Sequence, residues 1–266
     1  MGGLRFLLAQ TGLALQARMH DRFNFVIEQV SNVVFYLCAT VALAIIVMRF
    51  GRIGGFGLAE MMLVYGLNLV SYFIAGTYLW GVARTLEGSI RSGAFDLVLL
   101  KPVGPLVFLM ARSFEPSMPV KAAGAFALCL YALTLHDIGA SPATSIWLLA
   151  TIVGGTLIQG GIMLAFSSIG FWVSGSRDLV ELLIYGVRRT VDVPISIYPA
   201  PVQLVLTVVV PYAFVNYYPV LGLAGSTESA GMAALAASAL AVGLPCAAAG
   251  SALWRLGLRR YRAAGG

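Results

Sequence analysis

The chain has 266 residues, of which 59% are hydrophobic and only 11% are charged, and its mean hydropathy is +0.89. Soluble domains carry about 25% charged residues, and one core of this size cannot bury so much apolar surface. The composition excludes an ordinary soluble protein and predicts an all-α integral membrane protein. The net charge of +6 is spread between apolar blocks, which excludes nucleic acid as the expected partner and favours the lipid bilayer.

Membrane-spanning helices are predicted wherever about 20 mainly apolar residues follow one another, because that length crosses a hydrocarbon core of ~30 Å. Five runs qualify: 25–48, 59–83, 117–135, 144–172 and 230–254. Before them, apolar side chains recur at helical spacing on one side of residues 4–23. The region 1–24 is therefore predicted to be an amphipathic interfacial helix, and 25–266 to be one six-span transmembrane domain.

The position of the sixth span is ambiguous, because the segment 175–227 holds five of the eleven prolines, which interrupt helices. In one interpretation 178–197 is the fifth span, and 201–219 forms short re-entrant helices on the far side of the membrane. In the other, 201–223 is the span and 175–200 stays cytoplasmic. Both give six spans with both termini on the same side.

The orientation follows from the basic residues in the short loops. With the N-terminus inside, 13 Lys and Arg residues fall on one face of the membrane and only Arg49 and Arg52 on the other, leaving aside Arg188 and Arg189. Since cytoplasmic loops carry the excess of basic residues, both termini are predicted to be cytoplasmic.

The link between the second and third spans, 84–105, has the features of a short capped helix. Glu87 and Arg91 stand at i and i+4 in the order that favours a helical ion pair. Gly93 is suited to end that helix, Asp96 begins another turn, and two prolines follow. A rigid cytoplasmic lever for a soluble partner and a loop that merely connects two spans are both compatible with this pattern.

Charged residues inside spans are costly in lipid and usually face a cavity or a partner. Glu181, Arg188, Arg189 and Asp192 fall in the ambiguous segment. If 178–197 crosses the membrane, Arg188 and Asp192 lie one turn apart, and the four residues are candidates to line a translocation route at a subunit interface. If the segment is cytoplasmic, they are ordinary flanking charges.

The run LEGSIRSGAFDLVLLKPVGPL at 86–106 resembles a segment of the ABC-2-type exporter permeases, in the branch with the pattern G-x-[LF]-D-x-x-L-L-[RK]-P. The matching positions are Gly93, Phe95, Asp96, Leu99, Leu100, Lys101 and Pro102. Two later stretches, 198–225 and 253–266, resemble the same branch. Together with the six-span hydropathy, the resemblance covers most of the chain.

The resemblance implies a six-span permease subunit of an exporter in the plasma membrane. It implies an N-terminal interfacial helix and broken, re-entrant helices at 198–225, before the last span. It also implies a coupling helix that contacts an ABC ATPase subunit, and a second permease subunit in a homodimer or a heterodimer. The residues expected to couple the permease to the ATPase are Glu87, Arg91, Gly93, Phe95, Asp96, Leu100, Lys101 and Pro102.

The chain carries no recognisable site for ATP or a metal. A Walker-type loop requires Gly-Lys-Ser/Thr, but the only two lysines, Lys101 and Lys121, are followed by Pro102 and Ala122. The two histidines have no neighbouring ligands that would complete a metal set. ATP and Mg²⁺ are therefore expected on the partner ATPase, with no catalytic residue, metal or cofactor in this chain.

Two other classes of membrane protein fit the sequence less well. A secondary transporter or channel not powered by ATP often has internal repeats, and the two halves of this sequence show no convincing similarity. A membrane-embedded enzyme requires clustered Asp, His or Glu, and these residues are scattered singly. The sequence favours the exporter permease and leaves the secondary transporter or channel as the alternative.

Overall fold

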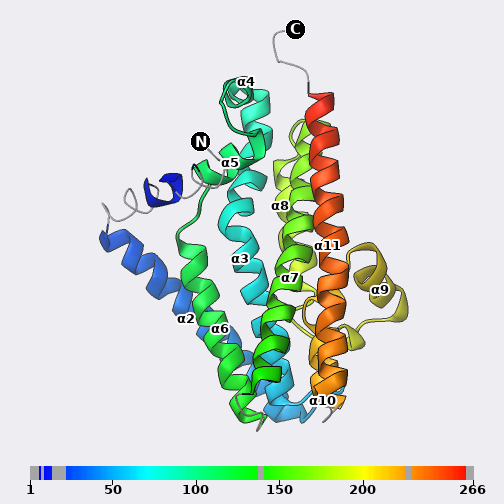
Figure 1. Cartoon of the computed structure of the whole chain (residues 1–266). Coiled ribbons are helices and arrows are strands. Elements are labelled where there is room, and N and C mark those ends of the chain that lie inside the picture. Colours follow the sequence, from blue (N-terminus) through cyan, green and yellow to red (C-terminus); the bar gives the residue numbers. More distant parts are fainter. Residues whose placement is uncertain (1–5, 7–8, 14–21, 137–140, 226–228, 262–266) are drawn as a thin grey trace.

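The chain folds as an all-helical bundle in a computed structural model (Figure 1), which describes residues 6, 9–13, 22–136, 141–225 and 229–261. The predicted interfacial helix at 1–24 lies largely outside these residues, although residues 9–13 are helical. The long helices are α2 Arg22–Phe50, α3 Leu58–Arg91, α6 Ser117–Leu135, α7 Pro142–Ser168 and α11 Ser229–Arg260. The shorter ones are α4 Ala94–Leu99, α5 Pro105–Arg112, α8 Arg177–Arg189, α9 Ala200–Leu204 and α10 Tyr217–Gly225. Single turns, η1 to η4, cover Ile169–Phe171, Ile195–Ile197, Val205–Val209 and Tyr212–Phe214.

Five of the helices are long and apolar enough to cross a membrane, in agreement with the predicted runs. The third run, 117–135, matches α6 to the residue. The apolar segments 200–209 and 212–223 bend by 79° at their junction, the geometry of a broken span or of a re-entrant loop. The described part of the chain contains no strand, only an isolated bridge between Ile53 and Phe56. These features confirm the all-α membrane fold.

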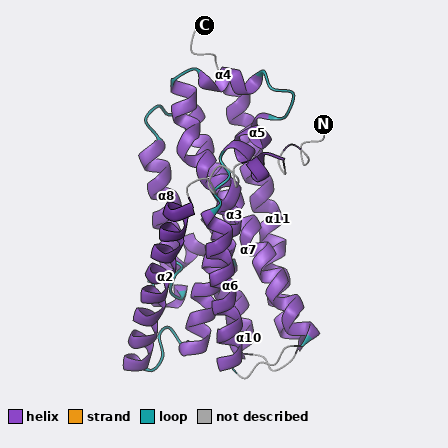
Figure 2. Cartoon of the chain, turned by 90° about the vertical axis from the view of Figure 1, so that its left-hand side faces the viewer, coloured by secondary structure: helices purple, strands orange, loops and turns teal. Residues whose placement is uncertain are grey.

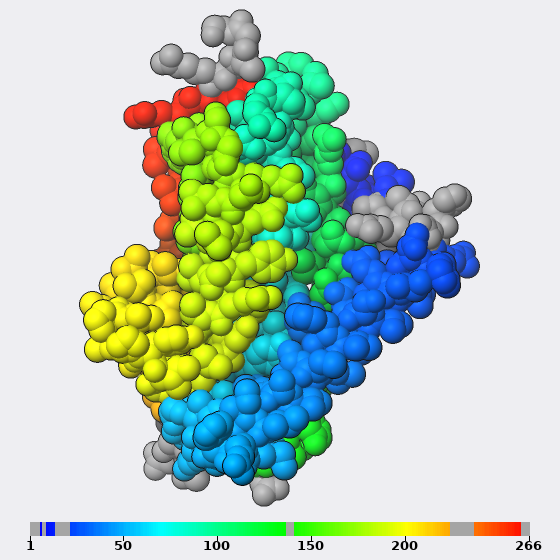
Figure 3. Space-filling view, turned by 180° about the vertical axis from the view of Figure 1, so that it is seen from behind, coloured from blue at the N-terminus to red at the C-terminus, as the bar shows by residue number. Residues whose placement is uncertain are grey.

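Helix α3 is the centre of the bundle, and α2, α6, α7 and α8 pack around it (Figures 1 and 2). Every side chain from Met61 to Phe73 is buried, as expected of a helix that is apolar on all sides. In contrast, α2 buries only Val47 among its 29 residues, and it crosses the outside of the bundle obliquely (Figure 3). The protein core is thus made by α3, α6 and α7 with α11.

The length of α3 carries it out of the membrane. Its first turn is capped by Glu60, whose carboxylate accepts a hydrogen bond from the Gly57 N–H (2.8 Å) and lies 3.2 Å from His136 at the end of α6. This polar cluster lies at the end of α3 that the predicted orientation places on the outer side of the membrane. Since 34 residues extend roughly 51 Å and the hydrocarbon core is ~30 Å thick, the other end of α3 projects on the order of 20 Å beyond it.

The segment 177–197 runs between the two ends of the bundle. At one end Arg177 and Arg84, near the projecting end of α3, both lie 3.3 Å from Glu181. At the other end the Ser196 hydroxyl donates to the carbonyl of Gly54 (2.8 Å), in the turn that leads into α3. This placement agrees with the first interpretation of the sequence, with 201–219 forming short broken helices.

The fifth crossing is not the continuous helix predicted over 178–197. Helix α8 has 13 residues and ends at Arg189, and Pro194 prevents helix formation further along. The rest of the segment is irregular apart from the single turn η2, and it is buried at Val191 and Ile195 (2% exposed), whereas Ile197 is 46% exposed. Non-helical backbone is tolerated at membrane depth where protein surrounds it.

Candidate functional site

The cytoplasmic link predicted as a separate short helix is largely the end of α3. This helix continues without a break to Arg91, so the short helix expected around Glu87 and Arg91 is the last part of α3 and not a separate element. Gly93 ends it as predicted, in the left-handed conformation (φ 73°) that glycine adopts without steric cost. Pro105 does not stop a helix; it occupies the first turn of α5, where its missing N–H is not required.

Glu87 is tied to the bundle instead of facing the cytoplasm. Its side chain is 7% exposed and lies 3.9 Å from Arg91, the predicted i,i+4 partner. The shorter contact is a hydrogen bond from the Gly175 N–H to the Glu87 carboxylate (2.9 Å), which joins α3 to the turn between α7 and α8. Glu87 therefore positions this turn and is too buried to offer much surface to a soluble partner.

Replacing Glu87 by alanine is expected to lower the free energy of unfolding by about 1–3 kcal/mol, because the Gly175 N–H loses its acceptor. Glu87→Gln keeps an acceptor oxygen and is expected to retain most of the stability. Arg91→Ala removes a guanidinium that is 73% exposed, and such pairs contribute less than about 1 kcal/mol. Thermal unfolding of the detergent-solubilised variants measures how much stability each one loses. Equal losses of stability for Glu87→Ala and Arg91→Ala would contradict the prediction.

Helix α4 is held against the projecting ends of the bundle by its inner face. Phe95 is fully buried, with its ring 5.6 Å from Phe171 and 4.9 Å from Tyr261. Asp96 accepts a hydrogen bond from the Tyr261 hydroxyl (2.8 Å). Partial burial and this hydrogen bond raise the pKa of Tyr261 to about 12, so the phenol stays protonated and donates at cellular pH. The inner face of α4 thus connects α3, the end of α7 and the end of α11.

The outer face of α4 exposes apolar side chains. Leu97 is 63% exposed and Leu100 is 80% exposed, and Lys101 and Pro102 follow them on the surface. Exposed aliphatic side chains grouped outside the membrane are typical of a protein contact site. We call Leu97, Leu100, Lys101 and Pro102 the α4 face. The sequence pattern includes three of these residues but does not distinguish them from Phe95 and Asp96, which point inward.

A second polar cluster lies within the membrane, where α8 ends. The Arg188 guanidinium lies 3.0 Å from the Asp192 carboxylate and 4.8 Å from the centre of the Tyr72 ring. The Asn68 amide donates to the same carboxylate (2.8 Å), and Gln159 of α7 donates to the Asn68 side chain (3.2 Å) and backbone carbonyl (2.9 Å). We call Arg188, Asp192, Asn68 and Gln159 the buried network. Asn68 stands ten residues, roughly 15 Å, from the outer end of α3.

Two asparagine side chains bind backbone carbonyls where α8 ends. The Asn68 amide lies 3.4 Å from the Arg188 carbonyl. Nearby, the Asn216 amide donates to the carbonyls of Val191 (2.6 Å) and Val64 (3.0 Å), which fastens the broken region after Pro211 to α3. Unpaired carbonyls are costly in a medium without water, so these two asparagines allow the chain to leave the helix inside the membrane.

The four charged residues predicted to line one route do not form one cluster. Arg188 is 6% exposed and Asp192 has a side chain 25% exposed, and they pair as predicted. Arg189, the next residue, is on the outside of α8. Glu181 lies two turns closer to the cytoplasmic end and pairs with Arg84 and Arg177. In the part of the chain that the structure describes, no group of three His, Cys, Asp or Glu residues could hold a metal ion.

Comparison with known proteins agrees with this architecture. The sequence profile of one family, described as ABC-2 family transporter protein, matches residues 33–265. No curated protein and no solved structure matches the chain. Proteins of this family are membrane transport components that work with an ABC ATPase, and the match covers all of the spanning helices except the first part of α2. The chain belongs to the ABC-2 family and is a multi-pass membrane permease of an ABC transporter.

Proposed function

We propose that the chain is one of two permease subunits of an ATP-driven exporter in the plasma membrane, with both termini in the cytoplasm. ATP and Mg²⁺ are bound by a separate ATPase subunit that docks on the α4 face. The observation that carries the proposal is the geometry of α3 and α4. One helix leads unbroken from the outer boundary to the cytoplasmic end, and the short helix after it presents exposed leucines there.

The packing of α4 suits it to pass movement into the membrane. Phe95 is enclosed by Phe171 and Tyr261, so α4 cannot move without moving the ends of α7 and α11. Glu87 links α3 to the turn that precedes α8. A displacement of the α4 face by ATPase subunits that close on ATP therefore reaches four elements at once, and biases the permease between inward-open and outward-open states.

Two of the four charged residues are assigned to the translocation route. Arg189 is exposed on α8, and the Asp192 side chain is partly exposed even though it pairs with Arg188; Arg188 is buried and Glu181 pairs with Arg84 and Arg177. Arg189 and Asp192 are proposed to face the second permease. Val208 and Val209 of the broken region are 68% and 70% exposed. They extend the same proposed interface.

The experiment is co-purification of the tagged chain with the products of its neighbouring genes, followed by mass spectrometry and an assay of vanadate-sensitive ATP hydrolysis. An ATPase subunit and a second permease, or a second copy of this chain, are expected in the complex. Purification of the chain alone in every mild detergent would favour a transporter that is not powered by ATP.

Leu100→Asp is expected to weaken ATPase association by about 2 kcal/mol, or roughly 30-fold, because the substitution places a charge at the centre of an apolar contact. The retained fraction of ATPase on the tagged permease measures the loss. Val173→Asp is the matched control, since Val173 is 47% exposed in the turn after α7 and lies outside the α4 face. Equal losses for the two variants would show that docking is not centred on α4.

A further inference from the structure

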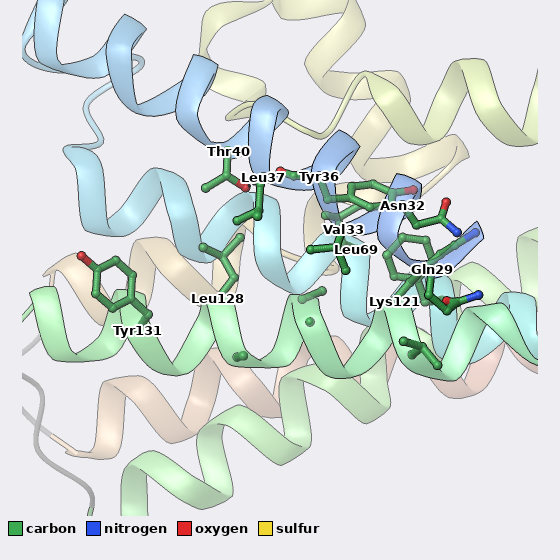
Figure 4. Close-up of a pocket in the computed structure, with 15 residues that line it drawn as sticks. Gln29, Asn32, Val33, Tyr36, Leu37, Thr40, Leu69, Lys121, Leu128 and Tyr131 are labelled. Atoms are coloured by element: carbon green, nitrogen blue, oxygen red, sulfur yellow. Dashed lines mark hydrogen bonds between the residues drawn. The ribbon is translucent and has the colours of Figure 1, made fainter. Parts of the chain in front are cut away.

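A groove of about 300 Å³ lies between α2, α3 and α6 (Figure 4). Aliphatic and aromatic side chains form most of its walls. Gln29, Asn32 and Lys121 gather toward one end of the groove, and Thr40 and Tyr131 lie toward the other (Figure 4). The groove exists because α2 crosses the bundle obliquely and packs loosely against it.

The polar end of the groove contains hydrogen-bonding groups that lack partners. Both the nitrogen and the oxygen of the Gln29 amide are buried without a hydrogen bond in the described part of the chain, and so is the Asn32 amide nitrogen. An unsatisfied buried group costs about 1–3 kcal/mol. Lys121 is half-buried beside them, and the carboxylates of Glu28 and Glu115 act on its charge. The groove therefore offers donors, an acceptor and a positive charge to a molecule that enters it.

The polar end lies close to the cytoplasmic boundary of the membrane. Helix α6 begins at Ser117, so Lys121 is on its second turn, from which a lysine side chain reaches the headgroup level. From Lys121 to Tyr131 the helix advances ten residues, or roughly 15 Å. That distance is half of a ~30 Å hydrocarbon core, so the groove follows the cytoplasmic leaflet from the headgroups to the middle of the membrane.

The dimensions of the groove exclude a protein helix. A helix with its side chains is about 10–12 Å in diameter. The groove, at 300 Å³, has room for only about ten groups the size of a water molecule, at ~30 Å³ each, which is too little for such a helix. A helix of a partner protein packed on the outside of α2 would also leave the Gln29 and Asn32 amides unpaired, because these atoms are buried beneath α2. A single acyl chain with a polar head has the required width and chemistry.

We infer that the groove binds one anionic glycerophospholipid of the cytoplasmic leaflet. Its phosphate pairs with Lys121, and its phosphate or ester oxygens accept hydrogen bonds from the Gln29 and Asn32 amides. A headgroup hydroxyl donates to the Gln29 oxygen, and one acyl chain follows the groove past Leu128. The lipid fills the gap between α2 and α6, so this inference does not depend on the proposed export function.

The test is native mass spectrometry of the full-length chain with its co-expressed partners, in nanodiscs of equal phosphatidylglycerol and phosphatidylcholine. The wild-type complex is expected to retain phosphatidylglycerol preferentially. Lys121→Met is expected to reduce this preference roughly fivefold, the effect of one basic side chain on an anionic lipid. Gly124→Leu is expected to abolish retention, since Gly124 lines the groove and a side chain added there meets only open space. Ala123→Leu, exposed on α6 outside the groove, is the matched control.

An unchanged lipid preference in Lys121→Met, or wild-type retention in a folded Gly124→Leu variant, would overturn the inference. A photo-reactive amino acid in place of Leu128 tests the occupant without filling the groove. A mass increment equal to a phospholipid is expected after illumination. Crosslinking of the residue to a second permease or to the ATPase instead would show that the groove is a protein interface.

Discussion

Replacement of Asp192 by alanine is expected to lower the free energy of unfolding by about 3–5 kcal/mol, because it leaves the guanidinium of Arg188 buried without its counter-charge. Arg188 is only 6% exposed and is enclosed by Tyr72 and the end of α8. The Asn68 amide loses its acceptor in the same variant. Thermal unfolding of the purified chain in detergent, followed by intrinsic fluorescence, measures the loss.

Arg189→Ala is the control for this substitution, since it also removes one charged side chain to alanine near the end of α8, but from the exposed side of the helix. It is expected to change stability by less than about 0.5 kcal/mol. The double variant Arg188→Met with Asp192→Leu removes both charges and is expected to recover most of the loss. If Asp192→Ala unfolds at the same temperature as Arg189→Ala, the pair contributes nothing and the buried network is not what secures α8.

Gly161→Ala is expected to destabilise the bundle by about 1–3 kcal/mol, the usual cost of forcing atoms into a packed interior. A methyl group at this position meets the backbone carbonyl of Cys246 on α11, and a methyl group added at Gly250 of α11 would in turn meet the backbone of Gly161. Backbone atoms cannot rotate away as a side chain does. The substitution therefore pushes α7 and α11 apart along the most extensive helix pair of the fold.

The neighbouring residue, Gly160, provides the comparison for Gly161→Ala. A methyl group at Gly160 makes only ordinary contacts, at 3.4 Å to Leu79 and 3.8 Å to Ala75. Gly160→Ala is therefore expected to be neutral, or to stabilise the helix by up to about 1 kcal/mol through the better helix propensity of alanine. Melting temperatures of the two variants, measured in the same detergent, test the difference. A melting temperature of Gly161→Ala at or above that of Gly160→Ala would disprove the close approach of α7 and α11.

The spanning helices could be predicted because hydrophobic length is a local property of the sequence. The run 117–135 gives α6 to the residue. The run 59–83 locates the membrane-embedded part of α3 but not the end of the helix, which continues to Arg91. Residues 84–91 are more polar, so the hydropathy falls at residue 83, where the membrane-embedded part is predicted to end. They include no proline, and the helix itself therefore continues beyond that point.

The roles of the charged residues could not be predicted, because they depend on contacts between distant segments. Arg188 and Asp192 are one turn apart and their pairing follows from helical spacing. Their burial depends on Asn68, more than a hundred residues away. An asparagine inside an apolar run indicates an interhelical hydrogen bond, but nothing in the sequence identifies its partner. The same holds for Glu87, whose acceptor role depends on Gly175.

The fifth crossing shows a different limit of prediction from the sequence. The prolines of 175–227 indicate broken helices, and the resemblance to the exporter permeases favours re-entrant helices there. The end of α8 at Arg189 is not foreseen, because no proline occurs before Pro194. Beyond the helix end, the Asn68 amide reaches the Arg188 carbonyl and the Asn216 amide donates to the Val191 carbonyl, and both asparagines come from other elements.

The attachment of α3 at Asn68 gives that helix two arms of unequal length. Asn68 is held by Asp192 on one side and Gln159 on the other. From this fulcrum the arm toward Leu58 measures roughly 15 Å and the arm toward Arg91 roughly 35 Å. If α3 pivots at Asn68, a displacement of its cytoplasmic end produces a smaller displacement of its outer end, and the force at the outer end is proportionally larger. In the proposed transport cycle, the lengths of the two arms would multiply the force about twofold at the outer end of α3, where packed helices would have to separate.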